Sequence, residues 1–172
     1  MASRIRTLST ADDRRADVIS AATTAFARRG YFGTNTTEVA QDAGISQAYL
    51  YRLYDNKEAL FVAVLAAARQ RIHDELRRTL DGTRSKDVDE ALLKQGVSDP
   101  DTAMVLLHAV AACIVPAIAT AVQDCYEDQL VFLRSRGAAA EAVRRYLADA
   151  QYANTLRAAG VDSSSPAHEL IP

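Results

Sequence analysis

Apolar residues recur at helical spacing along most of this chain of 172 residues. In the segment 18–27 they are Val18, Ile19, Ala22, Ala25 and Phe26, which fall on one side of an amphipathic helix. No segment alternates apolar and polar residues as a half-buried strand does. The pattern therefore predicts an all-α protein.

Polar capping residues and glycines divide the first half of the chain into four expected helices. A short polar side chain accepts a hydrogen bond at a helix start, and glycine adopts the left-handed conformation that ends one. Asn35 and Glu38 have the spacing of a capping box, and Gly30 and Gly44 are expected to end helices. The first expected helix runs from Ser9 or Thr10 to about Arg29, and the second from Asn35 to Ala43. The third runs from Ser46 to about Tyr54, and the fourth from Asn56 to about Leu80.

The second half of the chain is divided by turn-forming residues. Residues 81–86 are polar and rich in turn formers, which predicts an exposed linker. Pro100 and Pro116 each favour the first turn of a new helix. The expected helices cover residues 87–95, 99–114, 116–135 and 138–159, and the segment from Val161 is expected to be a poorly ordered tail.

The composition excludes several classes of protein. A net charge of −2 does not suit a protein that coats nucleic acid indiscriminately, so any DNA contact must be local. Two cysteines, Cys113 and Cys125, are too few for a disulfide scaffold and fit a reducing cytosol. The chain has no GxSxG, HExxH or phosphate-loop motif, so an enzyme is not expected.

The uncharged segment 103–122 raises the alternative of a membrane span, because it is long enough to cross a bilayer. However, much of it is alanine, which contributes little to insertion, and His108 and Pro116 interrupt it. We expect two buried helices separated by Pro116, no membrane partner and a cytoplasmic location.

Residues 36–54 have the pattern of a helix-turn-helix. Val39, Ala40 and Ala43 form a small apolar face, Gly44 permits a tight turn, and Ile45 is expected to enter the core. The outward face of the second helix is polar, and its Gln47, Ala48, Tyr51 and Arg52 suit contacts with bases or phosphates. A plain helical hairpin is the alternative, and this polar face argues against it.

This segment resembles the TetR family of bacterial regulators over residues 11–65. The resemblance rests on Ala25-Phe26, Gly30-Tyr31, Thr34, Val39-Ala40, Ala43-Gly44-Ile45-Ser46, Leu50-Tyr51-Arg52, Tyr54 and Asn56-Lys57-Glu58-Ala59-Leu60. It implies an all-helical homodimer with three DNA-binding helices, followed by helices that bind an effector and the partner subunit. The implied organisation is a helix-turn-helix domain in 1–56, an effector-binding and dimerisation domain in 57–160, and a flexible tail in 161–172.

The resemblance also implies which residues contact DNA. Thr36 and Lys57 are expected at phosphates, and Lys57 has the added advantage of the positive end of its helix. Tyr49 is expected either at DNA or packed beside Tyr54. The full set of expected DNA-binding residues is Thr36, Thr37, Ser46, Gln47, Ala48, Tyr49, Tyr51, Arg52 and Lys57.

Two features set this chain apart from its relatives. Leu53 stands where many family members carry a histidine, so one phosphate contact is expected to be missing. The first 60 residues contain eight Lys or Arg against seven Asp or Glu, which predicts a modest salt dependence of DNA binding. Arg4 and Arg6 could add contacts from an amino-terminal arm, or be solvated charges.

The last two long helices are expected to form the dimer. A face of small residues, including Ala139, Ala142 and Ala153, allows close helix approach, with a purely intramolecular core as the alternative. An effector pocket is expected among the fourth to seventh helices, since pockets are mostly apolar with a few polar groups. Its candidate residues are Met104, Leu107, His108, Ala111, Gln123 and Tyr126, with Cys113 and Phe132 as further candidates.

No metal or cofactor is expected, because His108 and Cys113 point to different sides of a helix and lack further ligands. The expected function is a transcriptional repressor that binds a palindromic DNA operator and is released by a small-molecule effector. An architectural DNA protein without a preferred sequence is the remaining alternative, and it predicts a footprint on many sites rather than on a palindrome.

Overall fold

The computed structural model describes residues 11–94, 99–162 and 164–167, and it confirms the all-α prediction because these residues contain no strand. Ser9, Thr10, Arg4 and Arg6 lie outside the described residues. In chain order the elements are α1 (Ala11–Gly33), α2 (Thr36–Asp42), α3 (Gln47–Leu53), α4 (Lys57–Leu80), the 3-10 turn η1 (Ser85–Asp87), α5 (Val88–Leu93), α6 (Pro100–Ala111), α7 (Pro116–Ser135) and α8 (Ala140–Ala158).

Three of the expected N-caps are formed as the sequence predicts. The side chain of Asn35 accepts a hydrogen bond from the Thr37 N–H. Ser46 caps α3, and Asn56 caps α4 by accepting from the Ala59 N–H at 2.8 Å. These caps satisfy N–H groups that have no partner within the helix, which explains why the helix starts match the prediction closely.

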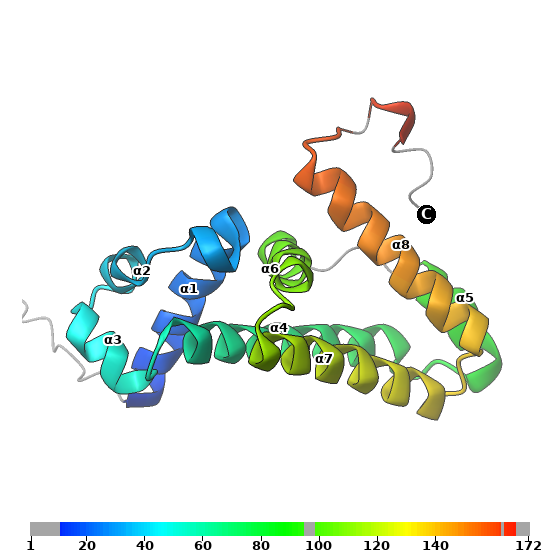
Figure 1. Cartoon of the computed structure of the whole chain (residues 1–172). Coiled ribbons are helices and arrows are strands. Elements are labelled where there is room, and N and C mark those ends of the chain that lie inside the picture. Colours follow the sequence, from blue (N-terminus) through cyan, green and yellow to red (C-terminus); the bar gives the residue numbers. More distant parts are fainter. Residues whose placement is uncertain (1–10, 95–98, 163, 168–172) are drawn as a thin grey trace, which may run out of the picture.

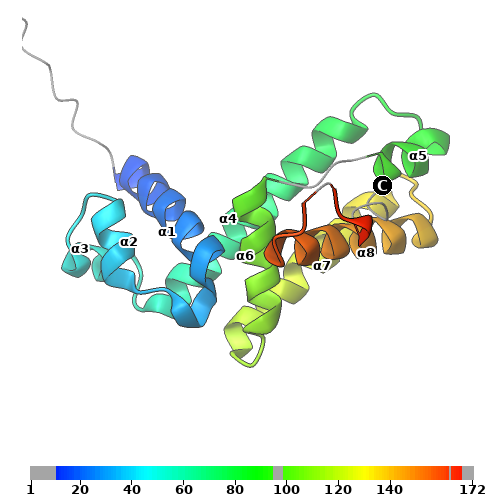
Figure 2. The same cartoon turned by 90° about the horizontal axis from the view of Figure 1, so that it is seen from above.

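The helices form an elongated molecule with α4 as its long axis (Figure 1). The short helices α2 and α3 lie with α1 at one end, and we call α1–α3 the amino-terminal unit. Helix α7 runs beside α4, and α5 and α8 pack together at the opposite end. Seen from above, α6 lies between α1 and the α7–α8 pair (Figure 2), and it contacts α1, α4, α7 and α8.

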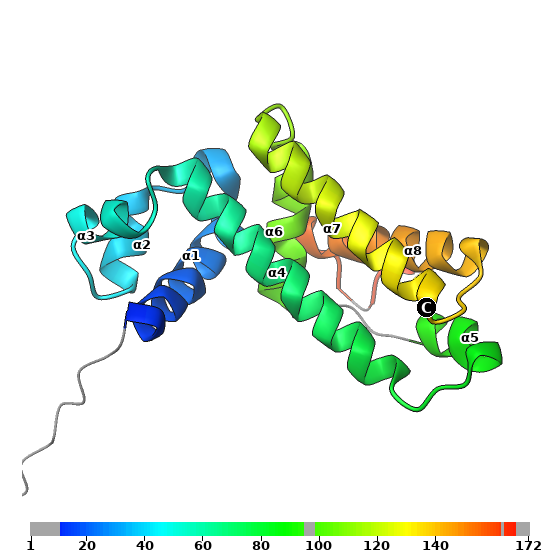
Figure 3. The ribbon, with the colours of Figure 1, turned by 90° about the horizontal axis from the view of Figure 1, so that it is seen from below.

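Figure 3 shows α4 running from the amino-terminal unit to the end of the molecule where α5 lies. Two hydrophobic cores hold this arrangement together, and α4 contributes to both. The first core contains Phe26 of α1 and Phe61 of α4, whose ring centroids lie 4.6 Å apart, together with Val105 of α6. The second contains Leu76 of α4 and Tyr146 of α8. The first core is continuous across residue 57, so the amino-terminal unit shares its interior with α4, α6 and the start of α7.

Helix α1 differs from the prediction at its carboxyl end. Gly30 does adopt positive φ (φ 68°, ψ 179°), but the chain then makes one further turn to Gly33. Glycine is almost the only residue that adopts this combination of angles. A Cβ atom at Gly30 would lie 3.0 Å from Nδ1 of His108, so α6 packs directly against the kink in α1.

Other boundaries differ where tertiary contacts intervene. Helix α6 ends at Ala111, three residues earlier than expected, because a turn precedes Pro116. The predicted linker contains part of η1, whose Ser85 lies against Gly137. In the predicted tail, the Tyr152 hydroxyl donates to the Ala167 carbonyl at 3.0 Å, which ties that residue to α8.

The small-residue face of α8 is directed into the chain. Ala142, Val143, Tyr146 and Ala153 are buried, and α8 packs on α5, α6 and α7. These four residues therefore pack inside the chain itself, whereas Ala139 is exposed. In the described part of the chain, no helix combines the length and the hydropathy needed to cross a membrane.

The kink at Gly30 yields a stability prediction. Gly30→Ala should lower the free energy of unfolding by about 1–3 kcal/mol, because the left-handed backbone is strained for alanine and the methyl group meets His108. Gly33→Ala is the matched control, since its Cβ would make only an ordinary contact with Arg29 at 3.4 Å, and it should change stability by less than about 0.5 kcal/mol. Urea denaturation followed by circular dichroism measures both. Equal stabilities of the two variants would contradict the assigned strain.

Candidate nucleic-acid interface

Helices α2 and α3 form a helix-turn-helix held by one small core. Gly44 has φ 66° in the turn, and the Ile45 N–H donates to the Ala40 carbonyl at 2.9 Å. Val39, Ala40 and Leu50 are buried, and Ile45 packs against them in a half-buried position. These contacts fix the angle between the two helices, so α3 presents a constant face to the outside.

The outward face of α3 contains the side chains that suit DNA contacts. Gln47, Ala48 and Arg52 are exposed, and Tyr51 is 42% exposed. Tyr49 is half-buried, and the Arg52 guanidinium carbon lies 5.7 Å from the centre of its ring. This cation–π geometry restrains Arg52 without removing its hydrogen-bond donors.

Thr36, which is expected at a phosphate, is buried beside the Tyr51 side chain. Thr36 is 6% exposed, and its Oγ1 lies 2.8 Å from the Tyr51 hydroxyl oxygen. The Gln47 side-chain amide also donates to this Oγ1, at 3.5 Å. Thr36 therefore positions two side chains of the α3 face, a role that local sequence patterns do not reveal because the partners lie 11 and 15 residues away.

Thr37 and Ser46 lie beside this face at the starts of their helices. Thr37 is half-buried, and its backbone N–H donates to Asn35. Ser46 is exposed, and its Oγ accepts from the Tyr49 N–H at 3.1 Å. Both belong to capping arrangements that hold α2 and α3 in place.

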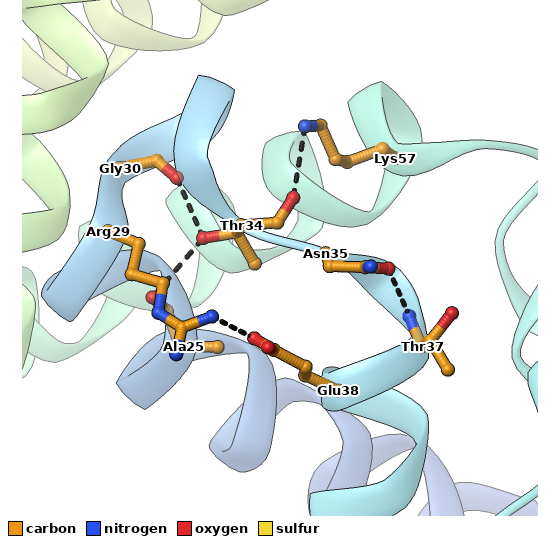
Figure 4. A network of polar contacts seen from close by, with 8 residues as sticks. All are labelled: Ala25, Arg29, Gly30, Thr34, Asn35, Thr37, Glu38 and Lys57. Atoms are coloured by element: carbon orange, nitrogen blue, oxygen red, sulfur yellow. Dashed lines mark hydrogen bonds and ion pairs between the residues drawn. The ribbon is translucent and has the colours of Figure 1, made fainter.

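Lys57 is anchored to the connection between α1 and α2 (Figure 4). Its ammonium group donates to the Thr34 carbonyl at 3.1 Å and lies 4.8 Å from the centre of the Tyr31 ring. Thr34 in turn donates its hydroxyl hydrogen to carbonyl oxygens of α1, at 2.7 Å to Gly30 and 3.2 Å to Ala25. The positive charge of Lys57 thus stabilises the amino-terminal unit internally.

Arg29 and Glu38 form an ion pair between α1 and α2 that the sequence did not predict (Figure 4). The Glu38 carboxylate, expected in a capping box, accepts a hydrogen bond from the Arg29 guanidinium. This hydrogen bond and the positive charge of Arg29 hold the pKa of Glu38 below its ordinary value. Two of the basic residues near the interface, Arg29 and Lys57, are therefore engaged within the protein.

The predicted effector-binding residues lie on α6 and α7 in mixed surroundings. Met104, Leu107 and His108 are half-buried on α6, and His108 lies against Gly30. The other three residues, Ala111, Gln123 and Tyr126, are exposed. A pocket of about 480 Å³ lies elsewhere, between α1, α4 and the start of α6, and none of the six residues lines it.

The two further candidates are engaged with their neighbours. Cys113 is half-buried, and its thiol donates to the Ala109 carbonyl at 3.3 Å. Phe132 packs on His73, with 4.7 Å between the ring centres. Each contact gives the residue a structural role that needs no ligand.

Comparison with known proteins supports the family resemblance. Residues 18–64 match the family described as "Bacterial regulatory proteins, tetR family". The HTH-type transcriptional regulator TtgR of Pseudomonas putida is 33% identical over 82 residues, which are 48% of this chain and 39% of that protein. The matched segments cover only 25–39% of the length of the curated relatives.

Solved structures share the fold of nearly the whole chain. A putative TetR-family transcriptional regulator from Rhodococcus sp. has a TM-score of 0.70 at 19% identity, with 92% of this chain and 94% of that chain covered. A putative transcriptional regulator from Saccharomonospora viridis in complex with choline also has a TM-score of 0.70, at 17% identity and 91% coverage of both chains. The arrangement of helices over nearly the whole chain is therefore a known fold.

The Thr36–Tyr51 contact yields the second prediction. In a double-mutant cycle, Thr36→Val and Tyr51→Phe should show a coupling of about 0.5–1.5 kcal/mol in the free energy of unfolding, because each variant removes the same hydrogen bond. The control cycle replaces Tyr51→Phe by Tyr49→Phe, which removes a hydroxyl group that is not bonded to Thr36, and should show no coupling. Additive effects of Thr36→Val and Tyr51→Phe would show that the hydrogen bond does not form in solution.

Proposed function

We propose that this chain, whose residues 18–64 match the TetR family of bacterial regulatory proteins, is a cytoplasmic, sequence-specific DNA-binding repressor. The observation that carries the proposal is the exposed polar face of α3 on a buried helix-turn-helix core. A helix held in this way can enter the major groove, where its side chains distinguish base pairs.

Within this proposal the residues of the interface have distinct roles. Arg52 and Gln47 contact base edges, since guanidinium and amide groups pair with guanine and adenine in the major groove. Ala48 allows close approach to a thymine methyl group, and Tyr51 is oriented by Thr36. The DNA backbone lies next to Thr37, Ser46 and Tyr49. The main-chain N–H groups at a helix start suit a phosphate group.

Lys57 and Thr36 contribute to phosphate binding less directly than the family pattern implies. Lys57 would have to leave the Thr34 carbonyl to reach a phosphate, and Thr36 is buried beneath Tyr51. We therefore assign both residues mainly to positioning. With few free positive charges at the interface, salt should weaken binding only modestly.

The proposal includes a homodimer that binds a palindromic operator. Support comes from α7, where Tyr126, Leu130 and Val131 are exposed, with Val131 68% exposed. Such side chains along one long helix suit burial against a second copy, and the α8 small-residue face is already used inside the chain. In this dimer α7 supplies most of the apolar contact.

A small-molecule effector would release the operator by moving α4 or α6. Helix α4 is shared by both hydrophobic cores, and α6 packs on the kink of α1, so a change in the body alters the position of the amino-terminal unit. Two such units must match major grooves about 34–36 Å apart, and a small tilt disturbs that spacing. The effector must bind the released state more tightly for this to occur.

The third prediction concerns the operator. Selection of bound duplexes from a random DNA pool should enrich an inverted repeat. On that duplex, Arg52→Ala and Gln47→Ala should each weaken binding by about 1–3 kcal/mol and relax the base preference at one position of each half-site. Fluorescence anisotropy with matched and mismatched duplexes measures both effects.

Arg77→Ala serves as the control, since Arg77 is an exposed arginine of α4 outside the interface. It should leave affinity and base preference unchanged. Equal binding to all duplexes would instead indicate an architectural protein without a preferred sequence.

A further inference from the structure

The pocket between α1, α4 and α6 is lined by charged groups of both signs. Helix α4 contributes Arg71, Arg78, Asp74 and Glu75, and the start of α6 contributes Asp99 and Asp101. The rest of the lining consists of three hydroxyl residues of α1 and of Thr102 from α6. Its volume of about 480 Å³ is in the range of small-molecule sites. Arg71, Asp74 and Arg78 are exposed, so a ligand can enter directly from solvent.

The two arginines of this pocket form no direct ion pair with its carboxylates, although the positive charge of Arg71 is one of the causes that lower the pKa of Asp99. Within the described residues, neither Arg71 nor Arg78 forms an ion pair with a carboxylate. Their hydrogen bonds go to neutral oxygens: Arg71 to the Thr102 hydroxyl at 3.4 Å, and Arg78 to the Asp74 carbonyl at 3.3 Å. Both guanidinium groups therefore keep donors for a ligand anion.

The carboxylates are likewise bonded to neutral groups. Asp101 accepts from the Thr24 hydroxyl at 2.8 Å, and Asp99 accepts from the Thr102 N–H at 2.9 Å and from its hydroxyl at 2.7 Å. The hydrogen bond from the Thr102 hydroxyl is the main cause that holds the pKa of Asp99 below its ordinary value, so it remains a carboxylate at neutral pH. Four carboxylates against two guanidinium groups leave an excess of negative charge.

We propose that this pocket binds a basic amino acid, a compact ligand with one carboxylate and two cationic groups. The ligand carboxylate would pair with Arg71 and Arg78, which lie seven residues apart and thus on one face of α4. Its α-ammonium and side-chain cation would pair with the carboxylates of α4 and α6. A simple anion leaves the excess negative charge unmatched, and a simple cation leaves the guanidinium groups unmatched.

The position of the pocket gives such a ligand an influence on DNA binding, and this part rests on the proposed function. Ser20, Thr23 and Thr24 belong to α1, whereas the charged groups belong to α4 and α6. A bound ligand would contact α1 on one side and α4 and α6 on the other, and it would compete with the Thr24–Asp101 hydrogen bond. If the amino-terminal unit can take two positions relative to α4 and α6, the ligand would therefore favour one of them.

Binding is tested on the full chain, without DNA, by isothermal titration calorimetry with L-arginine, L-lysine, agmatine, spermidine, L-glutamate and inorganic phosphate. Agmatine is arginine without its carboxylate, so it isolates the contribution of Arg71 and Arg78. We expect saturable binding of L-arginine or L-lysine, and agmatine weaker than L-arginine by about tenfold or more. Any of three outcomes would overturn the proposal. They are equal affinities for L-arginine and agmatine, binding of only spermidine, glutamate or phosphate, and no binding of any probe.

Two variants locate the site. Arg71→Gln should weaken L-arginine about tenfold or more but leave agmatine unchanged, whereas Asp101→Asn should weaken both. Arg77→Gln, on the same helix outside the pocket, should change neither. Circular dichroism and urea midpoints establish that each variant is folded, and unaltered L-arginine affinity in folded Arg71→Gln and Asp101→Asn would place the ligand elsewhere.

A final measurement separates the binding site from the proposed function. If the selected duplex exists, L-arginine should change its affinity in the unmodified chain and not in Arg71→Gln. If saturating L-arginine leaves the duplex affinity unchanged, only the proposed influence of the ligand on DNA binding is overturned. If no duplex is enriched, the proposed function fails, and the calorimetry still decides whether the pocket binds the amino acid.

Discussion

The requirement that one uninterrupted helix be buried in two separate cores governs the shape of this protein. Helix α4 has 24 residues and is about 36 Å long at 1.5 Å per residue. Its first half places Leu60, Phe61 and Val64 against α1, and its second half places Ile72 and Leu76 against the helices of the body. The two ends of the molecule are therefore rigidly related unless α4 bends or one core opens.

Local chemistry explains which features could be predicted from the sequence. The caps at Asn35, Ser46 and Asn56 and the turn at Gly44 depend on residues that are close in the chain, so their patterns are visible in one dimension. The helix-turn-helix and its exposed polar face followed from the same patterns. The continuation of α1 beyond Gly30 did not, because that turn is held by Thr34 and by packing of α6.

Tertiary partners explain what could not be predicted at the site. Nothing in the local pattern distinguishes an exposed threonine from Thr36, which is buried by a tyrosine of the next helix. The contacts of Lys57 with the Thr34 carbonyl and the Tyr31 ring likewise join α4 to residues more than 20 positions earlier in the chain. The polar pocket joins residues up to 82 positions apart, from Ser20 to Thr102, and no single motif contains them.

The shared first core also limits how freely the amino-terminal unit can be exchanged between proteins. Phe26 and Leu50 bury their side chains in a cluster that Val105 and Ala109 of α6 help to close. A fragment cut before α4 would expose this apolar surface to water, so it has little of the autonomy of a true module. A chimera that keeps α1–α3 but takes α4–α8 from another protein of this fold would need compatible residues on α4 and α6. Exchanging the exposed face of α3 between proteins of this fold thus requires matched interiors as well as a choice of outward side chains.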